Sequence, residues 1–242
     1  MTIVTTQDEF VLFGPAHLAV VFVTVTAVVA LISNRRRLQA AEDQWARRVV
    51  SAGLLGNELV SWVVGLVQGH GRIPFQLCDL ALVMTVWGLW SLRRSVSELA
   101  YFWGLAASLQ AVLTPDLREP FPTYWWVKFF AGHCGIVLGA VYLGATGRVQ
   151  PTGRSIWRVW GWTNLYAAAA GALNGMLGTN FGYLAHKPAH PSLLDHFGPW
   201  PYYIVGLELV GLLSFYLYYA PFVIGRWWTG RAKSLVGASS RC

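Results

Sequence analysis

The chain has 242 residues, of which 55% are hydrophobic and 12% charged, and its mean hydropathy is +0.45. A soluble domain carries about 25% charged residues, so this composition excludes a soluble protein with a polar shell. The formal charge of +7 does not indicate nucleic-acid binding, because the Lys and Arg residues lie in short clusters between apolar runs.

Seven apolar runs follow one another along the chain, separated by charged residues and by Pro and Gly. They cover about residues 15–33, 49–68, 75–92, 97–114, 124–146, 157–178 and 202–225. Each is close to the roughly 20 residues that a membrane-spanning helix needs. The sequence therefore predicts a single all-α membrane domain over residues 1–242, with seven transmembrane helices.

The distribution of basic residues predicts the orientation, since cytoplasmic loops carry the excess of Lys and Arg. With the N-terminus outside and the C-terminus in the cytoplasm, most of the 18 basic residues fall on the inner side. These are Arg35, Arg36, Arg37, Arg47, Arg48, Arg93, Arg94, Arg148, Arg154, Arg158, Arg226, Arg231, Lys233 and Arg241. Only Arg72, Arg118, Lys128 and Lys187 fall outside. An even number of spans would break this alternation.

The longest outer loop, residues 180–201, contains turn-forming residues together with Tyr183, Phe197 and Trp200. A solvated polar linker has no need of these aromatic side chains. We expect the loop to fold back over the outer end of the helices as an ordered cap.

Several ionisable side chains lie inside the apolar runs, where they are energetically unfavourable and indicate function. Glu58, Cys78, Asp79, His133 and Glu208 are of this kind. The amide groups of Gln110, Asn174 and Asn180 are candidate hydrogen-bond donors to an oxyanion. At 1.5 Å per residue most of these positions fall in the outer half of the bilayer. The pattern predicts an outward-facing pocket roofed by the 180–201 loop.

A cysteine and a histidine in one pocket suggest nucleophilic catalysis, because a thiol becomes a good nucleophile when an imidazole takes its proton. In this hypothesis Cys78 attacks an acyl carbonyl and His133 is the general base. Glu58, Asp79 or Glu208 would orient the imidazole ring. The alternatives are that Cys78 and His133 only pack and hydrogen-bond within the bundle, or that Cys78 forms a disulfide with Cys134.

No cofactor is expected. A retinal protein needs a Schiff-base lysine deep in a helix, and Lys128, Lys187 and Lys233 all lie at helix ends or in loops. A membrane haem needs facing histidines inside the bundle, whereas His17, His70, His186, His190 and His196 lie at outer ends or in outer loops. No zinc-binding spacing is present either, so we expect no metal site.

Several longer segments resemble the YwaF-like bacterial integral membrane proteins. They are Ile73-Pro74-Phe75-Gln76-Leu77-Cys78, Leu113-Thr114-Pro115-Asp116 with Phe121-Pro122, Lys128-Phe129-Phe130 with His133, and the run from Ser192 to Tyr203. Asn180, Tyr183 and Lys187-Pro188 also fit the pattern. The resemblance extends from about His17 to Glu208 and implies a location in a bacterial cytoplasmic membrane.

That family is similar to a eukaryotic multi-pass acyltransferase that remodels ether phospholipids with a cysteine and a histidine. The resemblance implies a membrane-embedded acyltransferase or esterase acting on phospholipid or fatty-acyl substrates, with Cys78 as nucleophile and His133 as base. The supporting or substrate-binding candidates are Glu58, Asp79, Gln110, Asn174, Asn180, Asp195, Glu208 and His17. The alternative function is a non-enzymatic seven-helix binding protein or transporter for a small molecule or proton. Membrane lipids are the expected partners, and the sequence does not determine the oligomeric state.

Overall fold

A computed structural model describes residues 9–40, 42–69, 71–188 and 192–239, with side chains as far as Trp228. These residues form helices and no strand. The helices are α1 (Pro15–Ser33), α2 (Arg35–Ala40), α3 (Gln44–Val67), α4 (Leu77–Ser91), α5 (Arg94–Trp103), the π-helical η1 (Gly104–Leu109), α6 (Gln110–Leu113), α7 (Tyr124–Ala145), α8 (Gly153–Leu177), the 3₁₀ helices η2 (Phe181–Tyr183) and η3 (Leu193–Phe197), and α9 (Tyr202–Ser239).

Each of the seven predicted apolar runs contains a helix, with α5, η1 and α6 forming one continuous rod. Two features were not expected from the runs. A short helix, α2, lies between the first two runs, and α9 continues well past the predicted end at residue 225 to Ser239. The ends of α9 and of α3 differ from the prediction because charged residues continue a helix as readily as apolar ones do.

Among the described residues, five helices are long and apolar enough to cross a membrane, which is typical of an integral membrane protein. They are Pro15–Ser33, Gln44–Val67, Arg94–Leu113, Tyr124–Ala145 and Tyr202–Trp228. Helix α4 is apolar but has only 15 residues, and α8 is long but less apolar. The predicted crossing by all seven rods is therefore supported for five of them.

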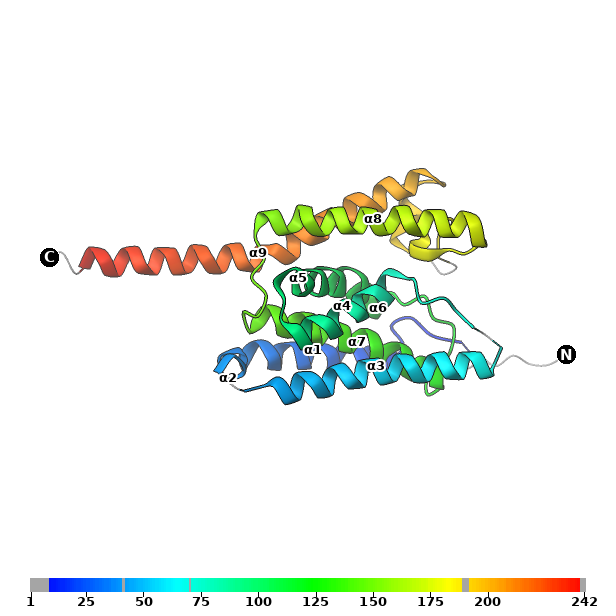
Figure 1. Cartoon of the computed structure of the whole chain (residues 1–242), viewed down its shortest axis with the longest axis horizontal. Coiled ribbons are helices and arrows are strands. Elements are labelled where there is room, and N and C mark those ends of the chain that lie inside the picture. Colours follow the sequence, from blue (N-terminus) through cyan, green and yellow to red (C-terminus); the bar gives the residue numbers. More distant parts are fainter. Residues whose placement is uncertain (1–8, 41, 70, 189–191, 240–242) are drawn as a thin grey trace.

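Helix α7 lies at the centre of the bundle, where it contacts α1, α3, α4 and the α5–α6 rod. Helices α8 and α9 pair with each other and pack against the α5–α6 side (Figure 1). Buried apolar side chains fill the interior around α4, α5 and α7, for example Phe102, Ala140 and Leu143. Consecutive rods run in alternating directions, so α1 and α9 point the same way (Figure 1).

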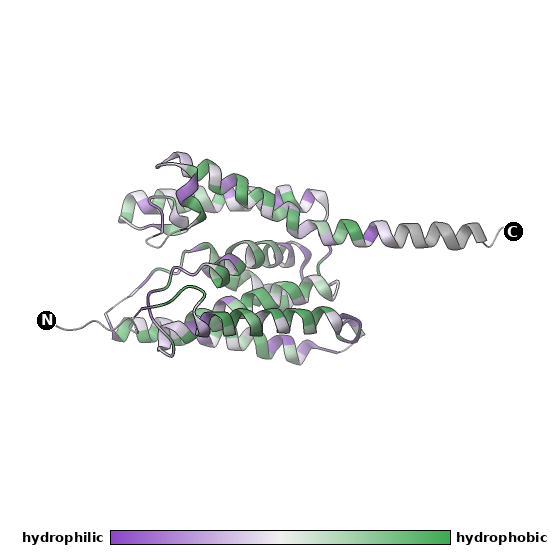
Figure 2. Ribbon diagram, turned by 180° about the vertical axis from the view of Figure 1, so that it is seen from behind, coloured by the Kyte–Doolittle hydropathy of each residue, from purple (hydrophilic) through white to green (hydrophobic). Residues whose placement is uncertain are grey.

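Large apolar side chains also cover the outside of the bundle. Phe22 on α1 is 72% exposed and Leu217 on α9 is 68% exposed. Figure 2 shows hydrophobic residues along the length of the helices and hydrophilic residues mostly near their ends and in the loops. Such a surface is unfavourable in water and is suited to contact with lipid chains.

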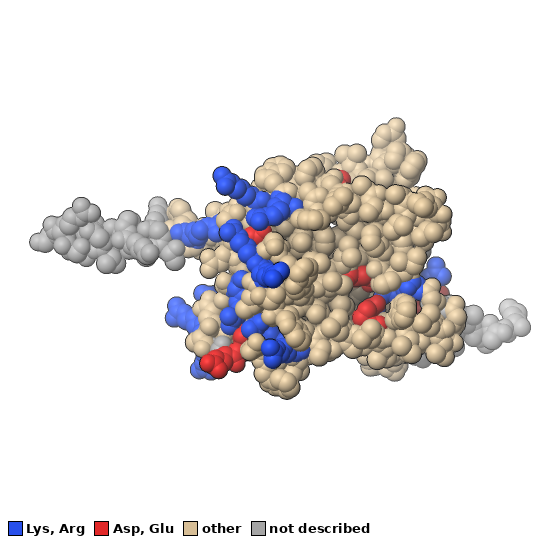
Figure 3. Space-filling view, in the orientation of Figure 1, with Lys and Arg blue, Asp and Glu red and all other residues tan. Residues whose placement is uncertain are grey.

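The charged residues gather at the two ends of the bundle. Figure 3 shows Lys and Arg side chains concentrated at the end where α5 and α8 begin, with a smaller mixed group of acidic and basic side chains at the opposite end. The basic end agrees with the sequence segments assigned to the inner side, and the mixed end is where the predicted site residues are found.

Candidate functional site

Helices α3, α4 and α7 enclose a small cavity near the mixed end of the bundle. Its volume is about 20 Å³, which is room for about one water molecule. It is lined by Glu58, Cys78, Asp79, Leu82, Lys128, Phe129, Gly132, His133 and Ile136. Cys78 and His133, which belong to different helices and are 55 positions apart, thus line the same cavity.

Cys78 lies in the first turn of α4. Gln76 precedes the helix in an extended conformation, and its N–H donates to Asp79 Oδ2 at 2.9 Å, which closes the helix start. The N–H groups of the first turn have no acceptor earlier in the helix, and the helix dipole is positive at this end. The dipole favours negative charge at Cys78, whereas the adjacent Asp79 carboxylate opposes it, so formation of a thiolate there depends on a base.

His133 has one ring nitrogen occupied and one available. Its Nδ1 lies 2.8 Å from the carbonyl oxygen of Phe129, one turn earlier on α7. Because a carbonyl oxygen can only accept, Nδ1 carries the proton and Nε2 of the neutral ring is left as an acceptor. The Phe129 ring lies 4.1 Å from the imidazole, centroid to centroid, and supports its orientation. This is the tautomer that a general base needs.

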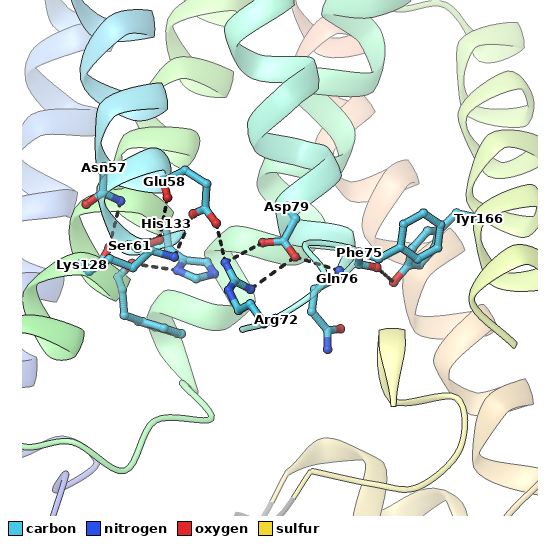
Figure 4. Close-up of polar contacts among 11 residues, drawn as sticks. Asn57, Glu58, Ser61, Arg72, Phe75, Gln76, Asp79, Lys128, His133 and Tyr166 are labelled. Atoms are coloured by element: carbon cyan, nitrogen blue, oxygen red, sulfur yellow. Dashed lines mark hydrogen bonds and ion pairs between the residues drawn. The ribbon is translucent and has the colours of Figure 1, made fainter. Parts of the chain in front are cut away.

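A chain of ion pairs borders the cavity (Figure 4). Lys128 Nζ lies 2.9 Å from Glu58 Oε2, and Glu58 Oε1 lies 2.6 Å from Arg72 Nη2. Arg72 in turn contacts Asp79 Oδ1 at 3.2 Å. Two positive and two negative charges alternate across α7, α3, the linker before α4, and α4. The charges balance, which is the condition for placing four ionised groups near apolar surroundings.

Arg72 stays charged at any physiological pH. Burial lowers the pKa of its guanidinium, but the neighbouring carboxylates of Asp79 and Glu58 raise it by more, so that the pKa lies above its ordinary value. In the sequence, Arg72 and Lys128 indicate only the orientation of the helices, and they are not among the predicted site residues. The signal that identifies them is the presence of Glu58 and Asp79 in apolar runs, since buried carboxylates require counter-charges.

The loop after α8 packs over this end of the bundle. The N–H of Gly182 donates at 2.8 Å to Oε1 of Gln76, which lies two residues before Cys78 in sequence. The hydroxyl of Tyr183 donates to Asp116 Oδ2 at 3.0 Å, and that of Tyr203 donates to the Tyr183 carbonyl at 2.5 Å. Burial, followed by the Asp116 charge, raises the pKa of Tyr183, so its hydroxyl remains a donor. These bonds tie the described part of the 180–201 loop to α4, to the α6–α7 linker and to α9.

The three amides considered as oxyanion donors do not line the cavity. Asn174 is buried and binds the backbone of Phe181 through both ends of its amide. Asn180 donates to the His186 carbonyl and accepts from the N–H of Ala185. Gln110 is exposed and donates to Thr114 Oγ1. Asn174 and Asn180 therefore stabilise turns of the loop. Gln110 bonds to a residue at the end of its own helix.

The remaining supporting candidates also lie outside the cavity lining. His17 is 1% exposed; its Nε2 lies 2.8 Å from the Val112 carbonyl and its Nδ1 accepts from the N–H of Phe13. Asp195 caps η3 by accepting from the N–H of Ser192. Glu208 accepts from Asn164 at 3.3 Å between α9 and α8. The structure therefore brings Cys78, His133, Glu58 and Asp79 together and places the other six candidates elsewhere.

The disulfide considered for Cys78 and Cys134 is absent, because both thiols are free. Cys134 faces α1, where its sulfur accepts from the hydroxyl of Thr24 at 3.2 Å. The two cysteines lie on different faces of the helix packing, as α7 separates the α4 side from the α1 side. Among the described residues no group of three His, Cys, Asp or Glu side chains is placed to hold a metal ion.

Comparison with known sequences gives one match. A model of the TMEM164 family, a family of membrane proteins, matches residues 12–219. The matched range includes all five ionisable residues that line the cavity, from Glu58 to His133. No curated protein and no solved structure matches the chain.

Proposed function

Since the chain belongs to the TMEM164 family, we propose that it is a membrane-embedded lipid acyltransferase or esterase with Cys78 as its nucleophile. The finer resemblance, to YwaF-like bacterial proteins and to a cysteine/histidine phospholipid acyltransferase, is part of this proposal. So are the bacterial cytoplasmic membrane, the crossing of that membrane by all seven rods, and the outside location of the N-terminus. The observation that carries the proposal is the shared cavity of Cys78 and His133, with Nε2 of His133 left as an acceptor.

In the first half of the reaction, His133 Nε2 takes the proton of the Cys78 thiol. The thiolate attacks the carbonyl carbon of a fatty-acyl ester and forms a tetrahedral intermediate. Collapse of the intermediate breaks the ester C–O bond, and the protonated His133 gives its proton to the departing alkoxide oxygen. The products are a Cys78 thioester and an alcohol, which is a lysophospholipid when the donor is a phospholipid.

In the second half, an acceptor hydroxyl replaces the thiol. His133 Nε2 takes the proton of that hydroxyl as its oxygen attacks the thioester, and the C–S bond breaks to return the Cys78 thiol. A lipid hydroxyl as acceptor gives acyl transfer, and water gives hydrolysis. The cavity, about 20 Å³, has room for about one water molecule, so it does not enclose a large pool of water that would favour hydrolysis.

Negative charge on the intermediate needs donors, and the structure changes which ones we propose. Asn174, Asn180 and Gln110 are bonded elsewhere, as described above. The donors we propose instead are the first-turn N–H of Cys78 on α4 and the Lys128 ammonium, since both residues line the cavity. Glu58 and Asp79 then act by holding the Lys128 and Arg72 cations in position.

The test is to trap the acyl-enzyme in the purified full chain. Incubation with a radiolabelled phospholipid acyl donor should leave a hydroxylamine-sensitive label on wild type and on the matched variant Cys134→Ser. The label should disappear in Cys78→Ala, and its rate of formation should fall about 10²- to 10⁴-fold in His133→Gln. A Cys78→Ala protein that still transfers or releases acyl groups at the wild-type rate would disprove the assignment.

A second candidate function is a non-enzymatic binding protein or transporter for a small molecule or proton. The ion-pair chain from Lys128 to Asp79 favours it, since buried charge networks also mark ion and proton pathways. Glu208, which this hypothesis included, lies between α8 and α9 and is not part of that chain. Ligand-dependent thermal stabilisation or flux that persists in Cys78→Ala would support this function over the enzymatic one.

A further inference from the structure

A second cavity lies at the opposite, basic end of the bundle, away from Cys78. It is an open groove of about 1010 Å³ lined by Arg94, Thr152, Gly153, Arg154, Trp157 and Arg158. Three arginines and a tryptophan line it, and no lining residue is acidic. In the sequence, these arginines indicate only the orientation of the helices. The proposed acyl chemistry does not use them.

A buried glutamate fixes two of the arginines in place. Glu98 on α5 is fully buried, and it accepts from Arg94 Nε at 2.9 Å and from the hydroxyl of Ser155 at 2.9 Å. Arg158 Nη2 lies 3.1 Å from its second oxygen. The arginine side chains remain 60% and 42% exposed. Each guanidinium therefore uses some of its N–H donors on Glu98, and its exposed part can donate to a ligand.

The third arginine has no counter-charge. Arg154 forms no ion pair or hydrogen bond with any described residue of the protein. By contrast, Arg47 and Arg148 at the same end of the bundle share the carboxylate of Asp43. Among the described residues, Glu98 is the one carboxylate paired with the arginines of the groove. The groove keeps a net positive charge and outward-facing donors in a fixed arrangement, which suits a phosphate group.

The position of the groove indicates that the phosphate belongs to a lipid. The groove lies where α5 and α8 begin, at the end of helices whose outer surfaces are apolar. Trp157 is 54% exposed within it, and Trp162 and Leu165 are exposed further along α8. A half-exposed tryptophan beside arginines is the arrangement found at the headgroup level of a bilayer.

From this arrangement we propose that the Arg94–Arg154–Arg158 groove binds the headgroup of an anionic phospholipid, with the guanidiniums on the phosphate and Trp157 against the adjoining glycerol and chains. The site is independent of the Cys78–His133 cavity, since the two lie at opposite ends of α4 and α8. Bound lipid would cross-link α5 and α8, which Glu98 already joins through Arg158 and Ser155.

The experiment is a titration of the purified full chain in neutral detergent with short-chain phosphatidic acid, followed by microscale thermophoresis. Parallel arms use short-chain phosphatidylcholine and inorganic phosphate alone. Phosphatidic acid should bind saturably and more tightly than either. Arg154→Gln should weaken its binding about fivefold, which corresponds to about 1 kcal/mol for one arginine at a membrane surface. Because Arg154 has no ion-pair or hydrogen-bond partner in the described part of the chain, this variant should fold as wild type does.

The matched control is Arg93→Gln, which removes the same charge one residue before Arg94 but does not line the groove. Its affinity should change less than twofold, and Cys78→Ala should bind as wild type does whether or not it retains acyl transfer. An equal loss in Arg93→Gln and Arg154→Gln would overturn the proposal, since binding would then follow overall charge. Equal affinities for phosphatidic acid and phosphatidylcholine would also overturn it, as would inorganic phosphate binding as tightly as the lipid.

Discussion

Some polar residues of this protein line the cavity, whereas others form hydrogen bonds with nearby backbone groups. His133 and His17 illustrate the difference. His133 uses only Nδ1 within the protein, on the Phe129 carbonyl, whereas His17 uses both ring nitrogens, on Val112 and Phe13. A histidine with both nitrogens bonded and 1% exposure has no atom left for proton transfer.

The substitution His17→Phe should therefore destabilise the protein without affecting its chemistry. The new ring keeps the aromatic contacts but leaves the Val112 carbonyl and the Phe13 N–H without their partner, a loss of about 1–3 kcal/mol. Thermal unfolding in detergent would show a lower midpoint, with acylation of Cys78 unchanged below that temperature. The exposed His196→Phe serves as the control. Loss of acylation in folded His17→Phe would return His17 to the site.

Glu58 is the residue on which the ion-pair chain depends, because it contacts both Lys128 and Arg72. Glu58→Gln would leave two cations next to each other with only Asp79 to balance them. We expect a destabilisation of about 1–3 kcal/mol together with slower acylation of Cys78, measured by thermal unfolding and by label incorporation. The control Glu42→Gln removes an exposed carboxylate at the other end of α3 and should change neither. If Glu58→Gln were as stable as wild type, the stabilising role assigned to the chain of ion pairs would be wrong.

At the scale of elements, the closest packing involves the loop that covers the site. A Cβ atom at Gly206 in the first turns of α9 would overlap with Cγ of Phe197, on η3. No real Cβ contact is this close, so η3 and α9 can pack as they do only because residue 206 is glycine.

Gly206→Ala should push Phe197 and the 3₁₀ helix away from α9, at a loss of about 1–3 kcal/mol, and increase protease cleavage in the 180–201 loop. Gly211→Ala is the matched control, because a Cβ there has nothing within 4 Å and lies in the same helix. Alanine is also the better helix former, so this control should be neutral or more stable by about 0.5–1 kcal/mol. Equal cleavage rates for the two variants would show that the Phe197 contact does not hold the loop.

At the scale of the molecule, the alternating rods and the basic end predict a number of crossings and an orientation that can be tested. If all seven rods cross, the N- and C-termini lie on opposite sides, and the positive-inside rule puts the C-terminus in the cytoplasm. A fluorescent protein fused after Cys242 should then fluoresce in a bacterial host, and alkaline phosphatase at the same point should be inactive. The same phosphatase inserted at Pro188 in the outer loop should be active. The reverse pattern would refute the orientation.

The sequence by itself determined the helices of this protein. A run of apolar residues must be helical in a bilayer, since every backbone N–H and C=O needs a partner and none is available from lipid. That rule uses only neighbours along the chain, and it located all seven rods to within a few residues except at the far end of α9. The sequence also predicts that Cys78 and His133 lie in the same outer half of the bundle, because depth follows from position within a rod.

Only the tertiary structure decided which polar residues belong to the site. Asn174, Asn180 and Asp195 have the right depth or loop, but their side chains are bonded to backbone groups that the loop conformation presents. Arg72 and Lys128 look like ordinary helix-end cations, yet they balance Glu58 and Asp79. Such assignments depend on which groups meet across different elements, and hydrophobic periodicity carries no information about polar partners. The groove of Arg94, Arg154 and Arg158 is of the same kind, since α5 and α8 form it together.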